Sequence, residues 1–163
     1  MPALKPVLPA ELQAGRPAVY EFSVRSARPV SWVWGELTSD RPLHWCKGIR
    51  KIEWTSPRPF AAGSTRRVHL GPGVRADELF YSWEESETLC EKAFYVQSAT
   101  APGLARLAEK YRVEAHPDGG SVFTWTLLIE PIGGDRVIGL SGLPVGLVVK
   151  WLQRDTERYL GSA

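Results

Sequence analysis

The chain has 163 residues, of which 44% are hydrophobic and 23% charged, and its formal net charge at pH 7 is +2. This composition is that of an ordinary globular protein with one domain, and it lacks the clustered basic surface that a nucleic-acid partner requires. Two cysteines, Cys46 and Cys90, are too few for a disulfide framework, so we expect a reduced, cytoplasmic protein.

The first 17 residues are expected to form an N-terminal arm, followed by a single domain over residues 18–163. Prolines interrupt every apolar run of the arm, so no secretory signal is predicted. Residues 18–24 alternate between apolar and polar side chains, with Tyr20 and Phe22 on the same face. This alternation predicts a half-buried strand at the start of the domain.

Two short helices are predicted after this strand. Pro29 suits a first helical turn, and apolar residues follow at helical spacing through residue 37. Residues 40–49 predict a second short helix or a turn. Here His44 and Cys46 suggest a thiol nucleophile, but residues two apart point to opposite sides of a helix. We therefore interpret Cys46 as a small buried hydrophobe.

From residue 49 the pattern changes to strands joined by short turns. Residues 105–113 also have a helical composition, but Leu107, Glu109, Tyr111 and Val113 alternate into a tight turn and favour a strand. The predicted strands cover residues 49–55, 64–70, 74–85, 88–99, 104–116 and 121–131.

The chain is predicted to end in a long amphipathic helix that begins near Pro144. Its apolar face comprises Val145, Val148, Val149, Leu152, Thr156 and Tyr159. The longest apolar stretch, residues 137–149, is too short to span a bilayer. A run of strands with helices before and after it predicts an α+β domain whose helices cover one face of an antiparallel sheet.

This order of elements resembles the START-like, or helix-grip (SRPBCC), superfamily, and within it the polyketide cyclase/dehydrase and lipid-transport group. Three stretches carry the resemblance together with the last helix: "FSVRSARPVSWVWGELTSDRPLHWCKGI", "FAAGSTRRVHL" and "HPDGGSVFTWTLLIEP". It covers about residues 18–160. It implies a curved sheet of six or seven strands wrapped around the C-terminal helix, with a deep cavity between them for a lipid, a polyketide or a similar molecule.

Three residues are candidates for catalysis in such a cavity. Glu109 shares an apolar face with Tyr111, and a carboxylate there is costly unless it is paired or protonated, so it is either an acid/base group or a structural partner of an arginine. Arg66 shares a face with Val68; it either points inward to bind an oxygen anion or lies on a solvated strand. Tyr81 is the third candidate, because a tyrosine hydroxyl can donate a proton.

The faces of the strand over 74–85 are nearly equal in polarity. Either Leu79, Tyr81 and Trp83 point inward, or Phe80 and Ser82 do so with Glu78. Aromatic residues with a polar atom suit the walls of a ligand site. The candidate ligand-binding residues are Trp32, Tyr81, Trp83, Tyr95, Tyr111, Phe123 and Trp125.

The sequence shows no metal-ligand cluster and no phosphate-binding loop, so no cofactor is predicted. Two functions remain open. The first is binding of a hydrophobic small molecule in the internal cavity. The alternative is an enzyme of the polyketide cyclase, aromatase or dehydratase type that uses acid/base groups in the same cavity. Neither nucleic acid nor stable membrane insertion is expected, and the choice between monomer and homodimer stays open.

Overall fold

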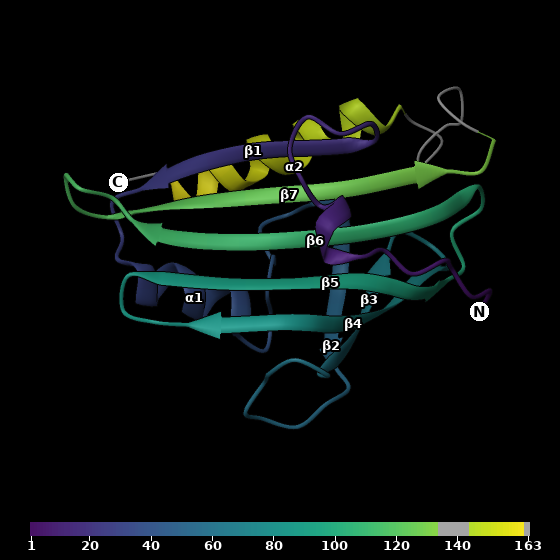
Figure 1. Cartoon of the computed structure of the whole chain (residues 1–163), viewed down its shortest axis with the longest axis horizontal. Helices are drawn as coiled ribbons and strands as arrows, with labels where there is room; N and C mark the ends of the chain where they lie inside the picture. Colours follow the sequence, from purple (N-terminus) through teal and green to yellow (C-terminus); the bar gives the residue numbers. More distant parts are fainter. Residues whose placement is uncertain (134–143, 162–163) are drawn as a thin grey trace.

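The fold is seen in a computed structural model that describes residues 1–133 and 144–161. In that part of the chain all strands form a 7-stranded antiparallel sheet in the order β1-β7-β6-β5-β4-β3-β2 (Figure 1). The elements are β1 (Val19–Ser26), α1 (Val30–Thr38), β2 (Ile49–Trp54), β3 (Thr65–Leu70), β4 (Val74–Glu85), β5 (Leu89–Ala99), β6 (Leu104–Ala115), β7 (Ser121–Pro131) and α2 (Val145–Leu160). The predicted α+β helix-grip fold is confirmed.

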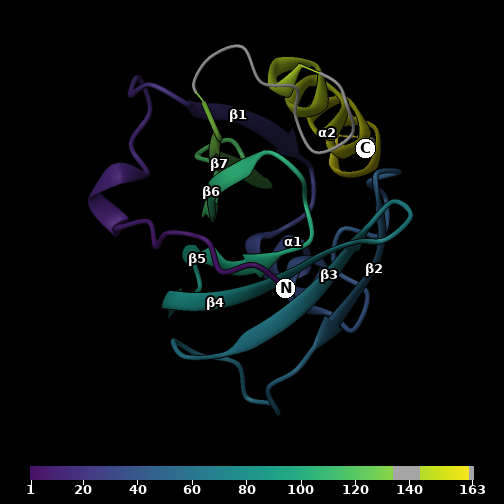
Figure 2. The same ribbon diagram turned by 90° about the vertical axis from the view of Figure 1, so that its right-hand side faces the viewer.

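The sheet curls into a half-barrel, and α2 lies along its open side next to β1 (Figure 2). Helix α1 packs against β5, β6 and β7 and closes one end of the curl. The inner face carries the main hydrophobic core, because alternate residues of each strand point to the same side. Tyr111 and Trp125 are paired across β6 and β7 and are fully enclosed in this core.

The N-terminal arm lies on the outer face of the sheet. Ala3 forms a bridge with Ser98, and a short 3-10 helix spans Pro9–Glu11. Val7 and Leu12 of the arm pack in a second, smaller cluster with residues of β5, β6 and β7. Both faces of the middle strands are therefore covered by apolar side chains.

The second short helix expected over residues 40–49 is absent, and the alternative of a turn is correct. Leu43 has a φ of 57°, which a continuous α-helix does not allow, and Pro42 before it lacks an N–H. The backbone closes two successive turns instead, with the N–H of Cys46 donating to Leu43 and that of Ile49 donating to Cys46, each at 2.9 Å.

The turn segment packs against α2 as a structural contact. The ring of Trp45 stacks on Tyr159 at 4.5 Å, and its indole N–H donates to the Thr156 hydroxyl at 3.2 Å. Cys46 is 1% exposed, and burial raises the pKa of its thiol to about 12. Its thiol therefore stays protonated at neutral pH and is a poor nucleophile.

Helix α2 has the predicted orientation. Val149, Thr156 and Leu160 are buried against the sheet, and Asp155 accepts a hydrogen bond from the backbone of Lys47 at 3.0 Å. Most of the apolar stretch 137–149 lies outside the described residues. No helix in the described part of the chain is long and apolar enough to cross a membrane.

Candidate functional site

A cavity of about 480 Å³ lies between the inner face of the sheet and α2. Its size suits a small organic molecule. The β3–β4 turn, with Gly71 and Pro72, and the half-exposed Trp151 of α2 border one end of the cavity. Most of the wall is apolar: Leu43, Ile52, Val68, Leu70, Val96, Leu104, Leu107, Leu127, Ile129, Val148 and Leu152.

Arg66 and Glu78 form a buried ion pair in the cavity wall. They are paired across β3 and β4, and the guanidinium Nε donates to the Glu78 carboxylate. Arg66 is 1% exposed and Glu78 4% exposed. The guanidinium also lies 4.6 Å from the ring centre of Phe94 and 5.1 Å from that of Phe80. Aromatic faces and one carboxylate thus hold the arginine inside the protein.

One donor of Arg66 has no protein partner. Its Nη2 donates to the Tyr111 hydroxyl at 3.4 Å, whereas Nη1 is buried without a hydrogen-bond partner in the described structure. A buried donor left unpaired costs about 1–3 kcal/mol. An acceptor atom of a ligand that reached Nη1 from the cavity would remove that cost.

Glu109 is the second carboxylate at this end. Its Oε2 accepts hydrogen bonds from the Tyr111 hydroxyl at 2.8 Å and from the Trp125 indole N–H at 2.9 Å. Burial, with the nearby Glu78 carboxylate as a second cause, raises the pKa of Glu109 to about 7. A carboxyl group with such a pKa can both release and accept a proton near neutral pH.

Lys92 lies behind this polar end, between the cavity and α1. It is fully buried, and its ammonium donates to the carbonyl of Leu37 at 2.6 Å. Its Nζ lies 5.0 Å from the ring centre of Trp83 and 5.4 Å from that of Tyr111. Burial holds the pKa of Lys92 well below its ordinary value.

A bulge in β4 decides which of its residues face the cavity. Phe80 is paired with Phe94 and Ser82 with Ala93, which leaves Tyr81 as an extra residue. The alternation is therefore reset, and Trp83 returns to the inner face opposite Lys92.

Tyr81 and Tyr95 consequently lie on the outer face. Their rings stack at 6.2 Å in the cluster beneath the N-terminal arm, away from the cavity. The expectation that Tyr81 shares a face with Trp83 is wrong, because the bulge lies between them. The hydroxyl of Tyr81 is buried without a hydrogen-bond partner in the part of the chain described.

The other predicted residues are only partly gathered in one place. Arg66, Glu109, Tyr111 and Trp125 all border the cavity at its polar end. Phe123 is buried on the inner face at 5.7 Å from Tyr111 but does not border the cavity.

Two predicted tryptophans lie near helices. Trp83 packs edge-on against Trp34 of α1 at 5.7 Å. Trp32 stacks with Tyr159 of α2 at 6.2 Å. Neither borders the cavity.

Sequence reasoning did not name Lys92 as a member of the site, and it placed Glu78 inward in only one of its two alternatives for residues 74–85. The available signal was their alternation with Phe80 and Phe94 along β4 and β5. The described residues contain no group of three or more potential metal ligands.

Comparison with known proteins places these features in context. Residues 17–162 match the protein family described as polyketide cyclase/dehydrase and lipid transport. An uncharacterized protein of Mycobacterium tuberculosis is 36% identical over 116 residues, which is 71% of this chain and 67% of that protein.

Two solved structures share the fold. A START superfamily protein from Mycobacterium smegmatis has a TM-score of 0.65 at 12% identity, covering 88% of this chain and 97% of that chain. A hypothetical protein from Helicobacter pylori has a TM-score of 0.67 at 13% identity, covering 98% of this chain and 97% of that chain.

Proposed function

The chain belongs to the polyketide cyclase/dehydrase and lipid-transport family, and we propose that its cavity binds a mainly apolar small molecule that carries one oxygen-bearing polar group. The apolar walls would bury the body of such a molecule, and the polar end would orient it. The single observation that supports this proposal most is the unpaired Nη1 of Arg66.

The acceptor of this N–H is expected to be a carbonyl, enolate or carboxylate oxygen of the ligand. Arg66 carries a positive charge that Glu78 already balances, so both a neutral and an anionic oxygen suit the site. The Oε1 of Glu109 makes no hydrogen bond to a described residue, so it is available to the same ligand group. A purely aliphatic molecule would leave both groups unsatisfied.

Filling the cavity tests the binding proposal. Val96 is 1% exposed and borders the cavity next to Glu78 across the β4–β5 ladder. Val96→Trp is expected to weaken binding of a bound molecule at least about 10-fold, with overpacking costing about 1–3 kcal/mol in stability. Native mass spectrometry of the freshly purified protein, and of protein mixed with oleic acid, naringenin or menadione, measures the occupancy.

The matched control is the same substitution on the outer side of the sheet. Val122 is half-buried and precedes the inward-facing Phe123 in β7. Val122→Trp should keep the occupancy of the unmodified protein. Equal occupancy in both variants would place the bound molecule outside the cavity, and no occupancy in the unmodified protein would contradict the proposal.

An enzymatic role is the second candidate, and the pKa of Glu109 near 7 favours it. In such a reaction, the Glu109 carboxylate takes a proton from the carbon next to a ligand carbonyl. The carbonyl oxygen, now an enolate, accepts the free N–H of Arg66, and Glu109 later returns the proton. Cyclisation and dehydration of a polyketide-like chain both begin with such an enolate.

Deuterium exchange distinguishes the enzyme from the binder. In heavy water, the unmodified protein is expected to accelerate exchange of the methyl protons of acetophenone about 100-fold or more over solution. Glu109→Gln should abolish that acceleration, because the amide cannot accept the proton. Proton NMR measures the exchange, and equal rates with both proteins would leave binding as the function.

A further inference from the structure

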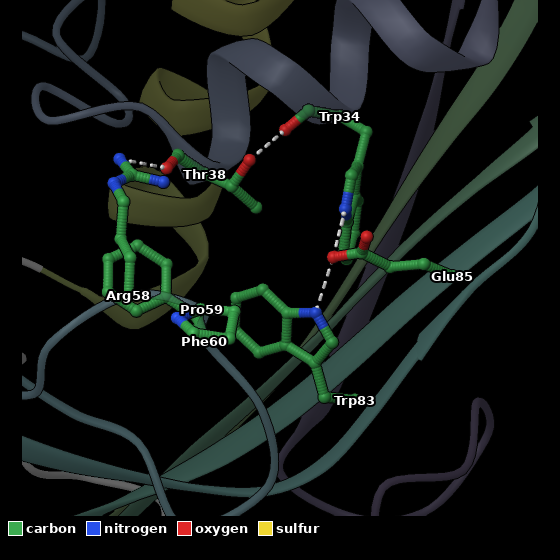
Figure 3. Close-up of a pocket in the computed structure, with 7 residues that line it drawn as sticks. All are labelled: Trp34, Thr38, Arg58, Pro59, Phe60, Trp83 and Glu85. Carbon is green, nitrogen blue, oxygen red and sulfur yellow. Dashed lines mark hydrogen bonds between the residues drawn. The ribbon is translucent and has the colours of Figure 1, made fainter.

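A second pocket of about 640 Å³ lies on the surface, away from the cavity. It is formed by the end of α1, the connection between β2 and β3, and the end of β4 (Figure 3). None of its wall residues borders the cavity, so the two are separate sites. The wall comprises Trp34, Thr38, Arg58, Pro59, Phe60, Trp83 and Glu85.

The carboxylate of Glu85 is held in place by two tryptophans. The indole N–H of Trp34 donates to its Oε1 at 2.9 Å, and that of Trp83 donates to the same oxygen at 2.6 Å (Figure 3). Within residues 1–133 and 144–161, Oε2 receives no hydrogen bond and Glu85 forms no ion pair. A fixed negative charge with a free oxygen therefore borders the pocket.

Aromatic rings surround this carboxylate. The rings of Trp34 and Trp83 meet at 5.7 Å, and Phe60 lies 6.1 Å from Trp83. Trp54 stacks on Phe60 at 3.9 Å and so supports it from behind. Electron-rich ring faces next to a carboxylate are the chemistry that recognises an organic cation.

The same rings already accommodate cations of the protein itself. The guanidinium of Arg58 lies 4.5 Å from the centre of Phe60 at the rim of the pocket. Its charge is balanced by Asp40 at 2.8 Å, and it also donates to the carbonyl of Thr38 at 3.0 Å. The Nζ of Lys92 lies 5.2 Å from Trp34 on the buried side.

Lys92 is a buried side chain that interacts electrostatically with Glu85. It does not form an ion pair with Glu85 in the described structure, because its ammonium donates to the carbonyl of Leu37 instead. Burial holds the pKa of Lys92 well below its ordinary value, although the Glu85 carboxylate is among the nearby charges that raise it. No protein cation in the described structure therefore forms a direct ion pair with Glu85 that would compete with a ligand.

We propose that this pocket binds a small alkylammonium cation, with Glu85 as its counter-charge and Trp34, Trp83 and Phe60 as its walls. An anion would be repelled by Glu85, and the carbonyl oxygen of Thr38 is already paired with Arg58. A neutral apolar molecule would cover the carboxylate without replacing its hydration, which is unfavourable. Only a cation gains from both the charge and the ring faces.

Choline and its neutral isostere 3,3-dimethylbutan-1-ol are the probes that test this proposal, because they share a shape and differ in charge. The indole N–H signals of the 7 tryptophans report binding in two-dimensional ¹H–¹⁵N NMR spectra. Choline is expected to shift the signals of Trp34 and Trp83 with saturation in the millimolar range. The affinity of the isostere should be at least about 10-fold lower than that of choline.

Glu85→Gln removes the charge but keeps a side-chain oxygen that can accept both indole N–H groups. This variant is expected to keep the thermal midpoint of the unmodified protein and to bind choline about 10-fold more weakly. Glu84→Gln makes the same change in charge at the exposed neighbouring residue and should leave choline binding unchanged. Val96→Trp, which fills the cavity, should also leave it unchanged.

Several results would overturn the proposal. They are equal affinity for choline and its isostere, unchanged choline binding in Glu85→Gln, and tighter binding of acetate than of choline. The absence of any shift of the Trp34 and Trp83 signals at about 50 mM choline would do the same, since cation–aromatic sites of this kind are weak but detectable. Loss of choline binding in Val96→Trp would place choline in the cavity and equally contradict a separate site.

Discussion

Replacing Arg66 by methionine is expected to lower the free energy of unfolding by about 3–5 kcal/mol, because it leaves the buried Glu78 without its partner. Both side chains lie inside the sheet, with Arg66 1% exposed. Methionine keeps much of the volume that the aromatic rings around the guanidinium contact, so the lost charge dominates the effect. Urea denaturation at pH 7, followed by circular dichroism, measures the change.

The double variant Arg66→Met with Glu78→Leu separates stability from binding. It removes both charges, and pairs replaced by apolar residues often regain the stability lost by a single change. We expect the double variant to recover most of the unfolding free energy and still to bind no oxygen-bearing ligand. If Arg66→Met alone lowers the free energy of unfolding by less than about 1 kcal/mol, Glu78 is neutral or solvated in the folded protein.

Glu109→Gln is expected to remove a pH dependence of stability that the unmodified protein shows between about pH 4.5 and pH 7. The folded protein binds this proton more tightly than the unfolded chain does, because burial raises the pKa from 4.5 to about 7. The stabilisation is therefore complete below pH 4.5, and it is lost as the pH rises through 7. The full loss corresponds to about 3 kcal/mol.

Denaturation curves from pH 4 to pH 8 measure this dependence in the unmodified protein, in Glu109→Gln and in a control variant. Glu87→Gln is the control, since Glu87 is exposed in the turn between β4 and β5. It makes the same change in formal charge and should leave the pH dependence intact. A Glu109→Gln protein that retains the full pH dependence would assign it to another group, and the acid/base role of Glu109 would lose its support.

Much of the fold follows from the residue pattern. The alternation along β6 and β7 is unbroken over its central part, so it places Glu109, Tyr111 and Trp125 on the inner face correctly. The last helix is correct for the same reason, since its apolar residues keep one helical face.

The middle strands could not be assigned in this way. A bulge adds a residue without a mark in the residue types, so counting along β4 fails after Phe80. The buried charges on these strands could not be assigned for another reason. Lysine and glutamate are mostly exposed in proteins, so the residue types of Lys92 and Glu78 do not indicate that both are buried.

The second pocket could not be predicted from the sequence at all. Trp34 lies in α1, Phe60 in the connection between β2 and β3, and Glu85 at the end of β4. Nothing in the spacing of such distant residues indicates that they meet, because their contact depends on how the sheet curls and where α1 packs. Only the tertiary structure brings them together.

The bulge in β4 also has a genetic consequence. The face on which Trp83 and Glu85 lie depends on the number of residues before them, and no point substitution alters that number. Deleting the codon of Ser82 in frame would remove the extra residue, and simple alternation would then still place both side chains on the inner face. The pocket around Glu85 is thus robust both to gradual sequence drift in β4 and to a one-residue deletion at the bulge.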